Sequence, residues 1–196
     1  MSAVPKNLLT PEQYLDRESA AEFKSEYFAG EMFAMAGGSP RHNRIALNLA
    51  AELRSALRGK GCRPFNSDLR VKIDATGLYT YPDVAVVCGE PEIESSQRCE
   101  TLLNPTLIVE VLSDSTETYD RTTKFRHYQK IETFREYVLV SQHEARVERF
   151  VRQDDGGWSY FIHEGLEVAF AAVPATLTLA DIYLDVEFPP AGPLRD

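Results

Sequence analysis

Two acidic residues interrupt apolar segments that follow one another along this chain. Asp83 begins an apolar run over residues 83–87, and Glu110 lies in the middle of a second run over 107–112. Apolar runs of this length usually form central strands covered on both faces, where an unpaired carboxylate costs several kcal/mol. Both acids therefore need a partner, and a shared divalent cation such as Mg²⁺, which takes oxygen ligands and keeps several waters, meets that need. The alternative is an ordinary acid at a strand start and another on a half-exposed strand.

The size and composition of the chain indicate one globular domain. Its 196 residues are 43% hydrophobic, enough to bury one sizeable core, and no repeat or long low-complexity linker divides them. We expect a single domain over residues 1–188 and a tail over 189–196. The formal net charge of -9 excludes a generally basic surface for coating DNA, because phosphate affinity comes from Lys and Arg. Any nucleic-acid binding must therefore be local or metal-assisted.

The cysteines and the apolar segments bear on the cellular compartment. Cys62, Cys88 and Cys99 are odd in number and lack a Cys-x-x-Cys spacing, so we expect buried reduced thiols rather than a disulfide framework or a zinc ribbon. The N-terminus has no apolar core of signal-peptide length, and no run approaches the ~18 apolar residues of a membrane span. We therefore expect a cytoplasmic protein without a membrane segment.

Capping residues and hydrophobic periodicity predict three helices. Thr10-Pro11 places an N-cap and a first-turn proline at the start of a short helix. Ser39-Pro40 opens a second helix, which carries one apolar stripe and ends before Gly59. Residues 116–131 form a third, charge-rich helix.

Strand-like segments alternate with these helices. Strands are expected over 62–73, 82–88, 106–112 and 137–140, with hairpins around residues 25–33 and 145–163. The connection from the strand at 106–112 to the strand at 137–140 runs through the third helix, so this pair should be parallel and its crossover right-handed. The order of elements predicts an α/β fold with a mixed β-sheet flanked by helices and with additional β-hairpins.

The positions of the two acids predict a shared metal site. Alternation along each strand places Asp83 on the face of Ala85, and Glu110 on the face of Ile108. If those faces coincide, the two carboxylates meet and can hold one metal ion. A metal so held can polarise a phosphodiester and generate hydroxide from a bound water, which are the two requirements of backbone hydrolysis.

A positive charge near the scissile phosphate is also needed. Lys124 is the candidate, because it lies in the helix that follows the strand of Glu110 and can fold back over the end of that strand. The alternative is an i,i+4 pair between Asp120 and Lys124 on an exposed helix, worth about 0.3–0.5 kcal/mol. The sequence leaves both interpretations open.

A series of short motifs runs in a fixed order through the chain. The series comprises Gly30-Glu31, Ser39-Pro40-Arg41-His42-Asn43, Tyr81-Pro82-Asp83-Val84, Asn104-Pro105-Thr106, Glu110-Val111-Leu112-Ser113, Thr116 and the segment from Asp120 to Lys124. Each motif alone is weak, but their order over residues 8–186 is specific, and it resembles the Uma-two family of restriction endonucleases, a branch of the PD-(D/E)XK nuclease superfamily. The resemblance implies a restriction-endonuclease-like core and cleavage of nucleic acid that depends on Mg²⁺, with Mn²⁺ as a substitute.

The resemblance also implies roles for individual residues. Asp83 matches the first acid of the superfamily motif and Glu110 the second, so these two residues would bind the metal. Leu112 stands where the motif has a lysine, which breaks the E-x-K element. The resemblance implies that Lys124, on the following helix, takes over the role of that lysine.

Three residues in the N-terminal part of the chain are further candidates. Glu31 belongs to the Gly-Glu pair of the family pattern and is a candidate catalytic acid, with a solvated hairpin glutamate as the alternative. His42 lies in the first turn of a predicted helix, where unpaired N–H groups favour anions, so it is a candidate for contact with a substrate phosphate. Arg41 is a candidate for substrate binding as part of a local basic rim, with a solvated helix face as the alternative. For His42, an ordinary surface or core hydrogen bond is the more common role.

The leading hypothesis is a Mg²⁺-dependent endonuclease that hydrolyses DNA phosphodiester bonds. The alternative is a catalytically weak or inactive nuclease fold that binds nucleic acid or a protein partner, which Leu112 and the acidic net charge favour. A purely structural domain is the third hypothesis. A homodimer is expected by analogy, because many nucleases of this fold cut two strands as dimers. The sequence does not identify the DNA structure or the bases that would be recognised.

Overall fold

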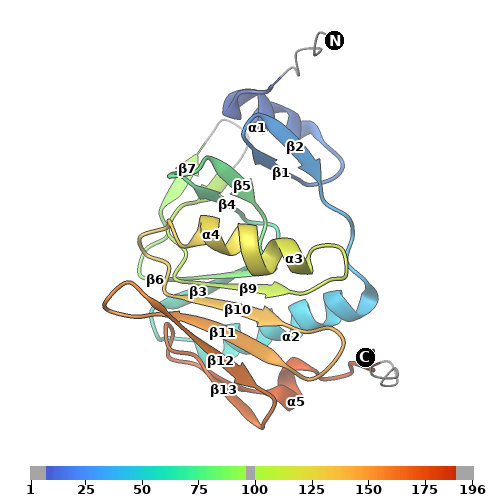
Figure 1. Cartoon of the computed structure of the whole chain (residues 1–196), viewed down its shortest axis with the longest axis vertical. Helices are drawn as coiled ribbons and strands as arrows, with labels where there is room; N and C mark the ends of the chain where they lie inside the picture. Colours follow the sequence, from blue (N-terminus) through green and yellow to red (C-terminus); the bar gives the residue numbers. More distant parts are fainter. Residues whose placement is uncertain (1–7, 96–99, 189–196) are drawn as a thin grey trace.

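A six-stranded mixed sheet lies at the centre of the structure, a computed structural model that describes residues 8–95 and 100–188 (Figure 1). The strand order of this central sheet is β12-β11-β10-β9-β6-β3. Its strands are β3 (Cys62–Asn66), β6 (Val84–Cys88), β9 (Leu107–Val111), β10 (Glu136–Val140), β11 (Val147–Arg152) and β12 (Trp158–His163). Strands β9 and β10 are parallel, as predicted for the helical crossover, and the other neighbouring pairs are antiparallel.

Alternating side chains of the central sheet form two apolar layers, one on each face. One layer joins Val84 and Val109 to the helix α2 (Pro40–Ala56). The other joins Ala85 and Ile108 to the helix α4 (Phe125–Tyr128). The faces of the two acidic strands therefore coincide, as the metal-site hypothesis requires. None of the helices within the described ranges has the length and hydropathy of a membrane span.

A second six-stranded sheet stands above the central one and carries the N-terminal part of the chain (Figure 1). Its order is β2-β1-β5-β4-β8-β7. The strands are β1 (Ser25–Phe28), β2 (Glu31–Ala34), β4 (Arg70–Ile73), β5 (Leu78–Thr80), β7 (Ile93–Ser95) and β8 (Glu100–Leu102). The helix α1 (Pro11–Ala20) packs on this N-terminal sheet through Tyr14, whose ring centroid lies 4.9 Å from that of Tyr27. The mixed α/β fold with sheets flanked by helices is thus confirmed.

The predicted strand over 62–73 proves to be two strands in different sheets. Strand β3 belongs to the central sheet and β4 to the N-terminal sheet. The chain turns between them at Asn66, whose side-chain oxygen accepts a hydrogen bond from the Asp68 N–H at 3.2 Å. Such Asx turns let an Asn or Asp side chain replace a backbone partner, so the polar residues after Phe65 end the strand. The prediction missed this break.

The predicted helix over 116–131 is divided into three short segments. A turn of α-helix, α3 (Glu117–Tyr119), leads into the π-helix η1 (Asp120–Lys124), and α4 follows directly. Asp120 and Lys124 are 3% and 5% exposed, so they are not a pair on a solvated helix face. The structure thus excludes the exposed i,i+4 alternative for these two residues.

The C-terminal part of the described chain covers the α2 side of the central sheet. It consists of the hairpin of β13 (Glu167–Ala169) with β14 (Thr176–Thr178), followed by the short helix α5 (Leu179–Ile182). Val168, Leu177 and Ile182 belong to the same apolar layer as α2. This hairpin and helix close the layer at the lower end of Figure 1.

The prediction of reduced thiols is wrong for two of the three cysteines. Cys62 of β3 and Cys88 of β6 are directly opposed in the antiparallel pairing and form a disulfide bond. The sequence gives the separation of 26 residues between them but not the strand register that brings them face to face. Cys99 lies outside the described residues.

The disulfide makes a testable prediction about stability. It closes a loop of 26 residues in the unfolded chain, a constraint worth about 3 kcal/mol. We expect Cys62→Ala/Cys88→Ala to lower the free energy of unfolding by about that amount under non-reducing conditions, measured by urea denaturation. Reductant should lower the stability of the wild type but leave that of the double variant unchanged. An equal effect of reductant on both proteins would show that this bond is absent in solution.

Candidate active site

Asp83 lies immediately before β6, beside the strand that carries Glu110. Its Oδ2 atom accepts a hydrogen bond from the backbone N–H of Val111 at 2.7 Å, which joins the two strand ends. Strands β6 and β9 pair antiparallel with Val84 opposite Val109. Consecutive apolar runs therefore bring the two acidic positions next to each other, as the spacing predicts.

Glu110 points into the apolar layer beneath the π-helix. The side chain is 5% exposed, and its Oε1 accepts hydrogen bonds from the Lys124 ammonium at 2.9 Å and from the Tyr128 hydroxyl at 2.9 Å. A carboxylate has two oxygens and about four acceptor positions, so these two bonds leave room for further donors or for a cation. The buried glutamate thus has the partners that its position in a central strand demands.

Lys124 reaches the same place from η1. Its Nζ atom lies 2.9 Å from Glu110 Oε1, 3.3 Å from Glu26 Oε1 and 3.5 Å from Asp120 Oδ1. The lysine side chain is 6% exposed, so these carboxylates take the place of water around its ammonium. The sequence-based expectation that this lysine folds back over the strand of Glu110 agrees with these contacts.

Lys124 and its three carboxylate partners form a cluster of buried charges. One of these partners, Glu26 of β1, was not predicted from the sequence. Its Oε1 contacts Lys124 and also accepts a hydrogen bond from the Thr80 hydroxyl. The sequence motifs point instead to Glu31, which pairs with Phe28 at the end of the β1–β2 hairpin. Alternation puts both glutamates on one face of that hairpin, so period-two spacing could have indicated Glu26 as well. Which of them meets the lysine depends on how the two sheets pack. A catalytic role for Glu31 stays a prediction.

His42 and Asp83 form a second contact at the edge of the site. His42 Nε2 lies 3.2 Å from Asp83 Oδ2, and the His42 backbone N–H is capped by Ser39 Oγ at 3.1 Å. His42 Nδ1 is buried without a hydrogen-bond partner and faces Gly38, where an added Cβ would lie only 2.7 Å from that nitrogen. The close packing of Gly38 therefore lets the imidazole reach Asp83.

Arg41, the neighbour of His42, makes its contacts elsewhere. Its guanidinium donates to the carbonyl oxygen of Glu187 at 2.9 Å and to that of Gln142 at 3.3 Å. With Arg44 and the segment 185–187 it lines a surface pocket at the start of α2. These contacts do not bring Arg41 to the acids, so its role in substrate binding stays a prediction.

Burial and like charge determine the protonation of the cluster. Burial, aided by the charges of Asp120 and Asp83, outweighs the Lys124 ammonium and raises the pKa of Glu110 to about 8. Burial also raises the pKa of Asp120. Burial lowers the pKa of Lys124, but the charges of Glu110, Glu26 and Asp120 outweigh it and hold this pKa well above its ordinary value. Lys124 is therefore a cation at neutral pH.

The pKa of His42 is also raised. Burial lowers it, but the hydrogen bond and the charge of Asp83 raise it by more. The site thus contains four carboxyl groups, those of Glu26, Asp83, Glu110 and Asp120, and two groups that can balance them, Lys124 and His42. This excess of acid favours a bound proton or an added cation.

The donor set decides which cation fits. Within the described residues, no group of three or more His, Cys, Asp or Glu side chains is arranged to hold a metal. A closed zinc site needs four such ligands, so the cluster does not fit zinc. Mg²⁺ is usually held by one or two carboxylates, several waters and substrate phosphates, so Asp83 and Glu110 fit it in number and chemistry.

Comparison with solved structures supports the fold. The crystal structure of a protein from Anabaena variabilis, described as "a putative nuclease belonging to DUF820", aligns with a TM-score of 0.69 and 20% sequence identity. The alignment covers 87% of this chain and 95% of that one. At this identity the likeness establishes a shared fold.

Comparison of sequences establishes the family. Two uncharacterized proteins of Synechocystis are similar to the chain: one is 40% identical over 156 residues, covering 80% of each protein, and the other is 37% identical over 174 residues, covering 87% of this chain and 97% of the relative. The model of the Uma2 family, described as "Putative restriction endonuclease", matches residues 11–186. The resemblance noted in the sequence is thereby confirmed, and the chain belongs to the Uma2 family.

Proposed function

We propose that this protein is a metal-dependent endonuclease that hydrolyses phosphodiester bonds of DNA. The observation that carries the proposal is the contact of 2.9 Å between the Lys124 ammonium and Glu110, on a strand whose end is bonded to Asp83. Two adjacent carboxylates and a buried cation are the groups that phosphodiester hydrolysis needs. Membership of the Uma2 family and the nuclease-like fold support the same reaction class.

Each residue has a distinct part in the proposed reaction. Asp83 and Glu110 would hold Mg²⁺, or Mn²⁺ in its place. The bound metal would supply a polarised phosphate oxygen and a water of lowered pKa. Lys124 places a fixed positive charge where negative charge develops on the phosphate, and its low exposure strengthens that interaction.

The N-terminal turn of α2 is the proposed contact with the rest of the substrate. Pro40 has no N–H and Ser39 caps the N–H of His42, so the attraction for anions there comes from the helix dipole and from His42, which is protonated more readily beside Asp83. We assign His42 and Arg41 to binding of the DNA backbone, and Glu31 to a supporting acid on the hairpin. Such local contacts suit a chain with a net charge of -9.

The alternative is a nuclease fold that binds nucleic acid or a protein partner without cleavage, and the contacts of Glu110 add to the observations that favour it. Glu110 is already bonded to Lys124 and Tyr128, so the cluster is balanced in part without metal. Metal binding and cleavage separate the two functions. A homodimer and a cytoplasmic location stay predictions from the sequence.

One prediction from the proposed function concerns cleavage. The purified protein should degrade DNA with Mg²⁺ and not with EDTA, in assays on single-stranded, duplex and branched oligonucleotides. Asp83→Asn and Glu110→Gln remove the charge that holds the metal, so cleavage should fall by several orders of magnitude. Lys124→Met removes one transition-state cation, which should lower the rate about 10²- to 10³-fold.

Matched control variants separate chemistry from folding. Asp114→Asn removes the acid of an exposed Asp–His pair, Asp114 with His143 at 2.7 Å, and should leave cleavage unchanged. Lys72→Met removes a lysine that pairs with Glu94 and Asp74 outside the cluster, and should also be neutral for cleavage. Wild-type protein that binds Mg²⁺ but cleaves none of these substrates would support the alternative function.

Another prediction concerns pH and metal together. A folded-state pKa near 8 for Glu110, above its ordinary value of 4.5, gives stability that is complete below about pH 4.5 and is lost as the pH rises to about 8. The raised pKa of His42 acts in the same direction. In EDTA, the free energy of unfolding should therefore fall between about pH 5 and about pH 8, and it should fall less in Glu110→Gln.

Added metal should reverse that loss. Mg²⁺ or Mn²⁺ binds the ionised carboxylates of the folded state, so it should raise the melting temperature of the wild type at about pH 8. Asp83→Asn should lose this metal-induced increase. If the metal produces no shift in the wild type, or the same shift in the variant, Asp83 is not a metal ligand.

A further inference from the structure

We propose that Glu26 is a positioning residue for the reaction, which holds the Lys124 ammonium in place beside Glu110. This inference rests on the proposed function and extends the site to the N-terminal sheet. Glu26 Oε1 lies 3.3 Å from Lys124 Nζ, and the glutamate side chain is 11% exposed. The series of motifs that carries the family resemblance begins at Gly30 and does not contain this residue.

Lysine needs such a partner because its side chain is long and flexible. The ammonium has three donors on a stem with four carbons, and fixing that stem costs rotamer entropy. Of its three carboxylate partners, Glu110 is also a proposed metal ligand and would share its charge with the metal. Asp120 belongs to the same helical turn as the lysine, so it moves with it. Of these three carboxylates, only Glu26 comes from the N-terminal sheet. It is not a proposed metal ligand, and it does not move with the helical turn of the lysine.

Glu26 is itself held by the strand that leads to Asp83. The Thr80 hydroxyl donates a hydrogen bond to Glu26 Oε1, and Thr80 ends β5, three residues before Asp83. Thr80 has no exposed surface. The Thr80–Glu26–Lys124 contacts therefore connect the segment that carries Asp83 to the ammonium beside Glu110.

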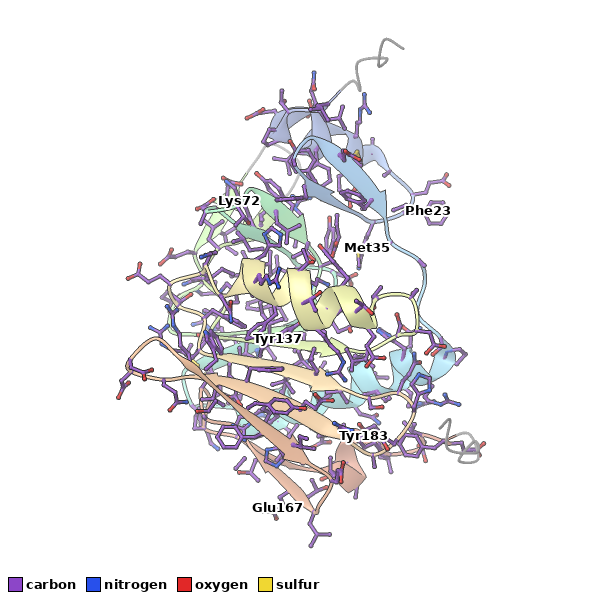
Figure 2. The ribbon with its side chains drawn as sticks, in the orientation of Figure 1. Phe23, Met35, Lys72, Tyr137, Glu167 and Tyr183 are labelled. Atoms are coloured by element: carbon purple, nitrogen blue, oxygen red, sulfur yellow. A yellow bond between two sulfur atoms is a disulfide. The ribbon has the colours of Figure 1, made fainter. Side chains whose placement is uncertain are left out.

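The N-terminal hairpin is thus a part of the active site and not an appended support. Figure 1 shows β1 and β2 above the segment of α3 and α4, and Figure 2 shows Met35, which follows β2, between the hairpin and that segment. The Glu26 contact joins these two parts of the molecule through charge.

A double-variant cycle between Glu26 and Lys124 tests the inference. Glu26→Gln keeps the size of the side chain and its acceptor for Thr80 but removes the charge that attracts the ammonium. We expect kcat for cleavage to fall about 10- to 100-fold, the effect of a misplaced catalytic group, with KM for the oligonucleotide within about 3-fold of wild type. In the Lys124→Met background, measured by single turnover with excess enzyme, the same substitution should cause no further loss.

Two more variants separate positioning from folding. Glu18→Gln changes another buried glutamate of the N-terminal part, bonded to the Ser25 N–H and the Tyr81 hydroxyl, and should lower the melting temperature without changing kcat. Thr80→Val removes the hydroxyl that donates to Glu26 but keeps the charge of Glu26, so we expect a smaller loss of kcat than in Glu26→Gln. If Glu26→Gln does not fold, Thr80→Val still tests the role of Glu26.

The outcomes are distinct for the two proposals. A wild type that cleaves no DNA substrate overturns the proposed function and this inference with it. A wild type that cleaves, with Glu26→Gln as active as wild type, overturns the inference alone. An equal loss of kcat from Glu26→Gln in the wild-type and Lys124→Met backgrounds also overturns it, because Glu26 would then act independently of the lysine.

Discussion

The buried ammonium of Lys124 is the interaction on which the arrangement of the whole molecule depends. Removing a cation from water costs several kcal/mol, and only well-placed anionic partners offset this desolvation free energy. Here the partners lie within 3.5 Å and come from β1, β9 and η1, that is, from both large sheets and the helical crossover between two strands. The packing of the N-terminal sheet on the crossover segment must satisfy this charge as well as bury apolar area. A small shift of either sheet would leave an uncompensated charge in the interior.

The crossover segment shows how the chain delivers that ammonium. Ordinary helical spacing already puts residues 120 and 124 on one face, and the π-helix widens the turn that contains them. Wide turns of this kind are rare and occur often at functional sites. The carbonyl oxygen of Asp120 accepts a hydrogen bond from the Tyr137 hydroxyl at 3.1 Å, and that of Thr118 accepts one from Thr122 Oγ1 at 2.6 Å. Side chains thus satisfy backbone groups within an irregular helical segment.

The sequence was sufficient for features that depend on local pattern and insufficient for those that depend on packing between sheets. Consecutive apolar runs indicated the strands of Asp83 and Glu110, period-two alternation indicated the face on which each acid lies, and the helix after Glu110 made Lys124 the candidate cation. Glu26 could not be chosen over Glu31 in the same way, because both lie on one face of the hairpin and only the docking of the two sheets distinguishes them. The Cys62–Cys88 bond was missed for a related reason, since spacing along a chain does not contain strand register.

Leu112, at the position where the family resemblance implies a lysine, fits this packing as an apolar residue. Leu112 is 3% exposed, lies in the apolar layer with Ala85 and Ile108, and stays in the sheet through its N–H bond to Val140 O at 2.8 Å. A lysine at that position would have to bury its stem in this layer and bring its ammonium to Glu110 from within the strand. The crossover segment already covers the same face and presents Lys124 to the glutamate from above the sheet. What the proposed chemistry requires is an ammonium about 3 Å from Glu110, close enough for a charge-assisted hydrogen bond, and helix packing meets that requirement as well as strand spacing does.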